Sequence, residues 1–139
     1  MNREMSEIIR HQDPLKLLPD ATVQEACKRM HARKVGAVLV TNERSHLEGI
    51  FTGRDAVRVL AQGKDPATTH LKEVMTRKPA WMPPRSTAIE ALRLMRDGGF
   101  RHVPVVLDEV VVGVVSRGDF RGLEQDRLDE ETGIWERMR

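Results

Sequence analysis

The sequence has few aromatic residues and almost no cysteine. Aromatic side chains make up 4% of its 139 residues, whereas proteins that bind single-stranded nucleic acid usually present several of them as stacking platforms. The single cysteine, Cys27, excludes an intramolecular disulfide framework and a thiolate cluster for structural zinc. A lone cysteine in an apolar helical row is typical of a buried, unreactive thiol. This cysteine usage favours a reducing compartment, and we expect the cytoplasm.

Long apolar runs and a dominant charge are also absent. Lys and Arg total 23 against 21 Asp and Glu, so the net charge is +2, and both signs are spread along the chain. Proteins that bind nucleic acid usually carry a basic stripe. No apolar run reaches the length that crosses a bilayer, and the charged stretch 1–14 lacks the apolar centre of a signal peptide. We therefore expect neither a nucleic-acid partner nor a membrane partner.

The motifs of common catalytic and metal sites are missing as well. The five histidines are scattered, and no His-x-x-x-His or Cys-x-x-Cys pattern occurs. The sequence contains no P-loop and no Gly-rich dinucleotide fingerprint, and Ser116 lacks the first glycine of a nucleophile elbow. We therefore expect a binding module rather than an enzyme, with no catalytic residue, no metal ligand and no catalytic cofactor.

What the sequence does contain is an internal repeat. The segment PDATVQEACKRM (19–30) aligns with PRSTAIEALRLM (84–95), 65 residues later, with Pro, Thr, Glu, Ala and Met at matching positions. The heptapeptides GIFTGRD (49–55) and GVVSRGD (113–119) align 64 residues apart, which places a one-residue difference in the loop around 42–46. We interpret the chain as two copies of one structural unit.

Each copy predicts the same order of elements. Thr-x-x-Glu at Thr22 and at Thr87 is typical of a capping box, and the apolar residues after it recur at helical spacing. Two β-branched runs follow and indicate buried strands, and a short helix is expected after each heptapeptide. The short apolar segments 15–17 and 80–82 predict one further strand ahead of each capped helix. A short amphipathic helix is also expected within residues 1–10.

The two heptapeptides allow two interpretations. A hydroxyl residue three positions before an aspartate, at the start of a helix, can satisfy free backbone N–H groups and act only as a cap. The same residues can form a polar clasp, because a carboxylate accepts both vicinal hydroxyls of a ribose and a helix N-terminus favours a phosphate. Gly49 and Gly113 would allow a close approach to the backbone at this point.

These residues carry a resemblance to a known family. The doubled heptapeptide, the strand RHVPVV (101–106) and the lead-in VMTRKPAWMPP (74–84) resemble the cystathionine-β-synthase-type domain, or CBS domain, which occurs as tandem pairs. The resemblance implies an α/β (α+β) fold of two β-α-β-β-α units, related by pseudo-two-fold symmetry and packed through their sheets. We place the domains at 8–62 and 70–122, followed by a charged C-terminal arm at 123–139.

The resemblance also implies that adenosine-containing ligands bind in clefts between the units. In both copies the expected ribose acceptor is the aspartate and the hydroxyl lies near phosphate, while Arg101 and His102 are expected to bind phosphate in the second copy. The first copy has Gly36 and Ala37 at the matching positions, so we expect any phosphate site in the second copy. The candidate residues of the first copy are Thr52, Arg54 and Asp55, with Val38 and Ile50 near adenine. Those of the second copy are Arg101, His102, Ser116, Arg117 and Asp119, with Ala80, Val103 and Val114 near adenine.

Three functions remain open at this stage. The preferred one is a stand-alone regulatory sensor that binds AMP, ADP, ATP, NAD or S-adenosylmethionine, forms a homodimer and acts on an unidentified protein partner. The second is a ligand-free homodimerisation module in which the heptapeptides are only caps. The third is a nucleic-acid binder, whose affinity would fall steeply with salt.

Overall fold

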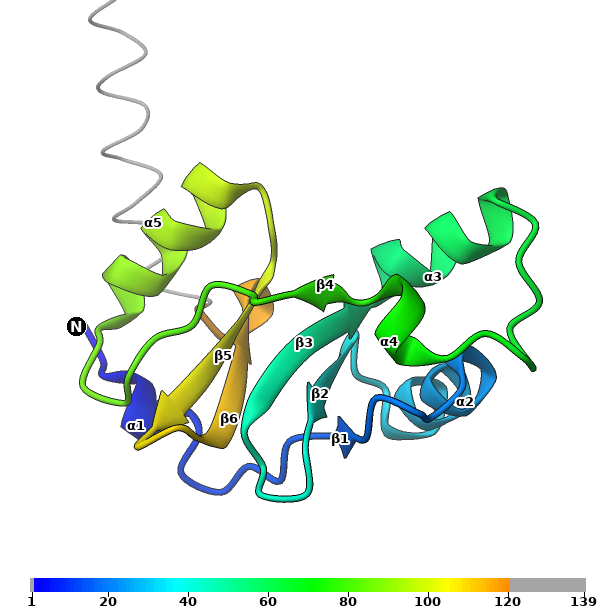
Figure 1. The fold of residues 1–139 in the computed structure, drawn as a ribbon. Coiled ribbons are helices and arrows are strands. Elements are labelled where there is room, and N and C mark those ends of the chain that lie inside the picture. The colour runs from blue at the N-terminus through cyan, green and yellow to red at the C-terminus, as the bar shows by residue number, and fades with distance from the viewer. Residues whose placement is uncertain (1, 121–139) are drawn as a thin grey trace, which may run out of the picture.

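A computed structural model of the chain describes residues 2–120, and within them six strands form two sheets. The first sheet has the strand order β1 (Lys16–Leu17), β2 (Ala37–Thr41), β3 (Leu47–Thr52), β4 (Thr76–Arg77), and the second pairs β5 (His102–Leu107) with β6 (Val110–Ser116). The helices are α1 (Met5–Ile8), α2 (Val23–Arg33), α3 (Gly53–Ala61), α4 (Leu71–Val74), α5 (Ala88–Gly98) and the 3₁₀-helix η1 (Arg117–Phe120). Figure 1 shows the two sheets side by side at the centre, with α5 on one side and α2 and α3 on the other. The predicted mixed fold with packed sheets is confirmed.

The two units repeat each other in hydrogen-bonding register. Ala37 pairs with Thr52 in the first antiparallel hairpin, and His102 pairs with Ser116 at the matching place in the second. Both hairpins carry a register shift at equivalent positions of their first strand. The extra residue of the first copy lies in the turn between β2 and β3, as the alignment of the copies predicts. The pseudo-symmetry read from the sequence is therefore present in the backbone.

Threonine caps begin the two long helices. At α5, Thr87 Oγ1 accepts a hydrogen bond from the Glu90 N–H at 3.4 Å, and the Glu90 carboxylate accepts from the Thr87 N–H at 3.3 Å. At α2, Thr22 Oγ1 accepts from the Glu25 N–H at 3.1 Å, but the Glu25 carboxylate pairs with Arg29 at 2.7 Å. The first of the two predicted capping boxes is therefore only half formed, because an arginine one turn later competes for its carboxylate.

The short segment ahead of each unit packs on the other unit. α1 precedes the first unit, yet Met5 is buried in the core of the second and its N–H donates to the Ser86 carbonyl at 2.8 Å. α4 lies at the very start of the second unit, ahead of its first strand pair, yet Leu71 is buried in the core of the first and its N–H donates to the Ala21 carbonyl at 2.8 Å. The helix expected near the N-terminus is present, and this exchange of segments ties the two units together.

Both heptapeptide glycines lie against the exchanged segments. A Cβ added at Gly49 would lie 2.5 Å from Met75 Sδ, and one added at Gly113 would lie 2.7 Å from Ile9 Cγ2. Van der Waals contact between carbon atoms begins near 3.5 Å, so no side chain fits at either position without movement. The close approach expected at these glycines is therefore made by the protein's own side chains.

The outer edge of each sheet is covered in a different way. In the first sheet, the backbone of β4 pairs with β3. In the second, the side-chain amide of Gln12 takes that place: its Nε2 donates to the Val114 carbonyl at 2.7 Å and its Oε1 accepts from the Val114 N–H at 2.6 Å. One side chain thus satisfies a stretch of exposed strand backbone that would otherwise invite further pairing.

One predicted strand is shorter than expected. The segment 80–82 forms only a single bridge, between Met82 and Val105, whereas the matching segment of the first copy forms β1. Pro104 in β5 stands where the first copy has Leu39, whose N–H donates to the Leu15 carbonyl at 2.9 Å, and proline has no N–H to make that bond. The second lead-in strand is therefore reduced to this one parallel bridge, because its partner strand contains a proline.

A shared apolar layer holds the two sheets together. Ala37, Leu39 and Ile50 of the first sheet pack against Val106 and Val111 of the second. Each unit also has its own core beneath its helices. The shared layer brings the start of α3, in the first unit, close to the loop that follows α5, in the second.

Two expectations concern residues that the structure describes only in part or not at all. Among residues 2–120, none of the helices has the length and apolar character needed to cross a membrane. The C-terminal arm at 123–139, and most of the short helix expected after the second heptapeptide, lie outside the described residues.

We predict that Gly49→Ala destabilises the fold, because the added Cβ would also lie 2.9 Å from the Thr76 carbonyl oxygen, which cannot rotate away. The free energy of unfolding should fall by about 1–3 kcal/mol, as in other overpacked sites. Gly53→Ala is the control, since nothing lies within 4 Å of a Cβ there. Urea denaturation measures both variants, and a Gly49→Ala protein as stable as the wild type would contradict this packing.

Candidate ligand-binding cleft

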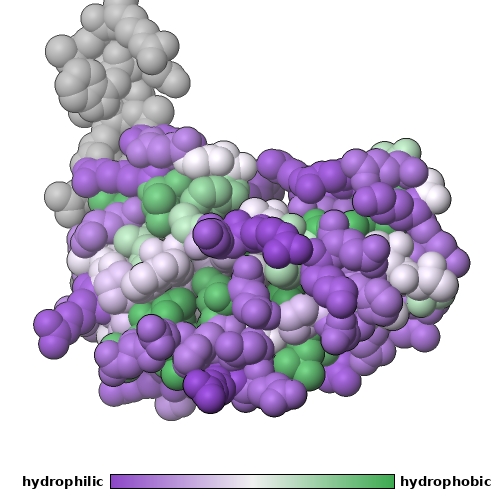
Figure 2. Space-filling model, viewed as in Figure 1, coloured by the Kyte–Doolittle hydropathy of each residue, from purple (hydrophilic) through white to green (hydrophobic). Residues whose placement is uncertain are grey.

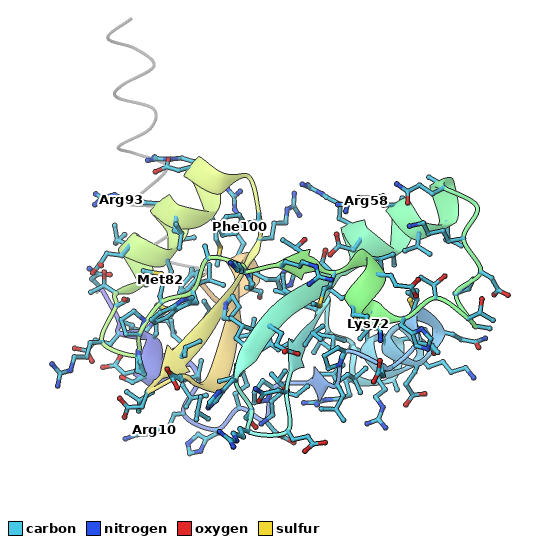
Figure 3. The ribbon with its side chains drawn as sticks, in the orientation of Figure 1. Arg10, Arg58, Lys72, Met82, Arg93 and Phe100 are labelled. Carbon is cyan, nitrogen blue, oxygen red and sulfur yellow. The ribbon has the colours of Figure 1, made fainter. Side chains whose placement is uncertain are left out.

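One cavity of about 560 Å³ opens between the two units. Its walls come from the start of α3, from β4 and the residues after it, and from the loop between α5 and β5. Figure 2 shows the hollow between the two helical lobes with hydrophilic residues around it, and Figure 3 places Arg58 and Phe100 on its opposite sides. The volume lies within the range of small-molecule sites, about 300–1,000 Å³.

The first heptapeptide forms a complete cap inside this cavity. Thr52 Oγ1 accepts from the Asp55 N–H at 3.4 Å, and Asp55 Oδ2 accepts from the Thr52 N–H at 3.0 Å. Asp55 Oδ2 also accepts from the Thr52 hydroxyl at 3.2 Å, and Asp55 Oδ1 pairs with Arg58 at 3.0 Å. The capping interpretation is therefore confirmed for this copy. A carboxylate has about four acceptor positions, and these three bonds leave about one for a ligand.

The second heptapeptide forms the same kind of cap elsewhere. Asp119 Oδ2 accepts from the Ser116 N–H at 2.7 Å and from the Ser116 hydroxyl at 3.3 Å. The turn continues as η1 rather than as an α-helix, and Asp119 is exposed. Ser116, Arg117 and Asp119 do not line the cavity described here.

Arg101 and His102 lie in the cleft of the first heptapeptide, although the sequence interpretation grouped them with the second. The Arg101 carbonyl does accept from the Arg117 N–H at 3.0 Å, so the backbone there adjoins the second cap. The residues themselves line the cavity together with Thr52 and Asp55. The cause is the shared layer between the sheets, which sets the loop before β5 opposite α3.

His102 is half-buried in the cavity wall. A Cβ at Gly36 would lie 3.2 Å from His102 Nε2, so the ring rests on a residue that has no side chain. Burial lowers the pKa of His102, the Asp119 carboxylate opposes that shift, and the Arg101 guanidinium adds to it. The net lowering of its pKa favours the neutral imidazole in the cleft without a ligand.

The apolar candidates divide into two groups. Ile50 and Ala80 line the cavity, although the sequence interpretation assigned them to different copies. Val38 and Val103 are fully buried in the cores of the first and second unit. Val114 packs against the shared layer between the sheets. Only Ile50 and Ala80 are therefore placed to contact a ligand in this cavity.

Several lining residues were missed by the sequence interpretation. Arg58 lies one turn after Asp55 on α3, and Lys78 directly precedes Pro79 in the lead-in to the second unit. Gly98, Gly99 and Phe100 line the side of α5, and the remaining missed residues are Gly36, Gly53, Thr76 and Pro79. Arg54 spans the gap, because its Nη1 donates to the Gly99 carbonyl at 3.3 Å. The spacing of Arg58 from Asp55 on a helix could have predicted that Arg58 lies near the site. No local sequence pattern predicts that residues at the end of α5 line the same cavity.

The arrangement suits a polar organic molecule. A carboxylate and two arginines come from α3, Lys78 and Arg101 come from the other walls, and apolar residues also line the cavity. Within the described residues, no group of three or more His, Cys, Asp or Glu side chains is arranged to hold a metal ion.

Comparison with known sequences identifies the repeated unit. The CBS domain family model matches twice, at residues 5–62 and 71–125. The CBS domain-containing protein CBSCBSPB2 of Arabidopsis thaliana is 44% identical over 108 residues, which cover 77% of this chain and 20% of that protein. The chain thus spans about a fifth of the length of this relative.

Solved structures share the fold. The CBS domain protein PAE2072 from Pyrobaculum aerophilum, complexed with AMP, has a TM-score of 0.82 at 24% identity, over 93% of this chain and 98% of that one. The CBS domain pair of protein MJ0100, in complex with 5′-methylthioadenosine and S-adenosyl-L-methionine, has a TM-score of 0.77 at 26% identity, over 84% of this chain and 94% of that one. Because the two family matches fall on the two units whose registers repeat, the chain belongs to the CBS domain family and carries a tandem pair of CBS domains.

Proposed function

We propose that the chain is a regulatory module that binds one adenosine-containing ligand in the cleft at Asp55. The candidates remain AMP, ADP, ATP, NAD and S-adenosylmethionine. The observation that carries the proposal is the cavity itself, which has a buried carboxylate at one end, cations at the other and the apolar residues Ile50 and Ala80 between them. The bound ligand would act on a protein partner, which is unidentified, and the predicted compartment is still the cytoplasm.

The ribose end is assigned to Asp55. Its side chain is 4% exposed and is held in one orientation by Thr52 and Arg58. A fixed carboxylate with about one acceptor position left can bind one ribose hydroxyl directly. A second hydroxyl would displace the Arg58 guanidinium, which is then free to turn toward a phosphate.

The phosphate end is assigned to Arg101. This side chain comes from the second unit and faces the N-terminus of α3, whose free N–H groups and dipole favour an anion. The MJ0100 pair, which is similar to this chain, is described in complex with two adenosyl compounds, and this supports the ligand class. The proposal assigns binding and no catalytic step to these residues.

A specific observation also supports a homodimer. Val57 and Leu60 lie on the outer face of α3 and are 64% and 70% exposed. Both heptapeptides also form cap hydrogen bonds without any ligand. A ligand-free dimerisation module is therefore the second candidate function, and the dimer interface would include this face of α3.

The ribose assignment predicts that Asp55→Asn weakens ATP binding about ten-fold to a hundred-fold, the loss typical of a hydrogen bond to a charged group. Asp119→Asn, the matching change in the other copy, should leave affinity unchanged. Calorimetry with ATP and with 2′,3′-dideoxy-ATP separates recognition from folding. The wild type should discriminate between the two ligands and Asp55→Asn should not. Equal affinity of the wild type for both would remove Asp55 from the ribose site.

The neutral state of His102 predicts proton uptake on binding. A phosphate in the cleft adds negative charge beside the ring and raises the pKa of His102 toward its ordinary value of about 6.5 or beyond. Calorimetry near pH 6.5 in buffers of different ionisation enthalpy measures the protons taken up. His102→Gln should take up fewer protons than the wild type with the same nucleotide. Identical proton counts would show that His102 does not face the phosphates.

The dimer assignment predicts that Leu60→Glu shifts sedimentation equilibrium from dimer to monomer without unfolding the chain, because residue 60 is exposed. Leu107→Glu is the matched control, since Leu107 is 51% exposed on the other unit. A dimer that survives Leu60→Glu but is lost in Leu107→Glu would place the interface elsewhere.

A further inference from the structure

The cationic residues that line the cleft at Asp55 are not repeated at the matching positions of the other copy. Four cationic side chains line the cleft at Asp55, and the positions that match them along the repeat hold three glycines and one aspartate. The lining cations are Arg54, Arg58, Lys78 and Arg101. Their counterparts at the repeat shifts are Gly118, Gly122, Asp13 and Gly36, of which Gly122 is known here by residue type only.

Most of this positive charge is not compensated by the protein. The Asp55 carboxylate pairs with Arg58 at 3.0 Å and is the only acid among the lining residues. Arg54 donates to a neutral carbonyl, that of Gly99. Within residues 2–120, the side chains of Lys78 and Arg101 have no hydrogen bond or ion pair. Three cations therefore remain for an anionic ligand.

Lys78 is held at this wall in an unusual backbone conformation. Its φ of 46° lies in the left-handed region, and it directly precedes Pro79, a position that disfavours helical conformations. The Lys78 N–H donates to the Glu48 carbonyl at 3.4 Å, which anchors the residue beside β3. Non-glycine residues kept in this region often lie at ligand sites.

We infer that the cleft selects a nucleoside di- or triphosphate over a monophosphate and over S-adenosylmethionine. The inference rests on the proposed adenosyl site and specifies its ligand. One phosphate at the N-terminus of α3 would engage Arg101, and a longer phosphate chain would reach the remaining cations at Lys78 and Arg54. A sulfonium group would instead face these cations, and like charges brought together in a partly enclosed site reject a ligand.

In the other copy, one arginine side chain joins two of the positions that match the lining of this cleft. Arg33, at the position that matches Gly98, donates to the Asp13 carbonyl, and Asp13 matches Lys78. The bond therefore links two positions whose counterparts, Gly98 and Lys78, both line the cleft at Asp55. We accordingly expect one nucleotide per chain.

Calorimetry without divalent cations tests the selection with ATP, ADP, AMP, adenosine and S-adenosylmethionine. We expect ATP and ADP to bind at one per chain and at least about ten-fold more tightly than AMP, the gain of roughly one charge-assisted contact. Affinity for S-adenosylmethionine should be below that for AMP. Lys78→Ala should weaken ATP binding about ten-fold while AMP affinity changes little.

Lys34→Ala is the matched control, because Lys34 is also an exposed lysine with a left-handed φ, 56°, but does not line the cavity. Its ATP affinity should equal that of the wild type. If AMP or S-adenosylmethionine binds as tightly as ATP, or if Lys78→Ala has no effect on ATP, the selection is overturned while the adenosyl site stands. If none of the five compounds binds, the proposed function itself fails.

Discussion

The apolar contact between the two sheets determines where every residue of the cleft lies. Leu39 and Ile50 on one sheet meet Val106 and Val111 on the other, and all four are buried. Burial of apolar surface is non-directional, so this layer alone would allow the units to slide. The exchanged segments remove that freedom, because each is hydrogen-bonded to one unit and covalently continuous with the other. The cleft is thus a consequence of how two similar units are locked together.

The heptapeptide at Asp55 serves the fold and the site with the same atoms. Its carboxylate completes the cap of α3 and pairs with Arg58, which holds the side chain still before any ligand arrives. A group that is already oriented loses little conformational freedom on binding, so its hydrogen bond to a ligand is not offset by ordering. The capping and clasp interpretations are therefore compatible in the first copy. In the second copy, Asp119 accepts from the N–H and the hydroxyl of Ser116 at an exposed turn outside this cavity.

Sequence reasoning succeeded where the signal is local. The repeat, the strand pairs and the caps depend on residues within one unit, and a one-residue insertion in a turn did not disturb them. It failed where the position of a residue depends on contacts between the two units. Arg101 and Ala80 belong to the second copy in the sequence, but they line the cleft of the first heptapeptide. Lys78 was missed because its place in the cleft depends on the wall that α3 forms in the other unit. Val38 and Val103 were assigned to a ligand, although strand alternation turns both into the cores.

The most direct test of the account is a crystal structure of the full chain grown with saturating ATP. The account predicts one nucleotide per chain, with its ribose at Asp55 and its phosphates between the N-terminus of α3 and the side chains of Arg101 and Lys78. A nucleotide bound beside Asp119 instead, or an empty cleft with Arg54 still joined to Gly99, would contradict it.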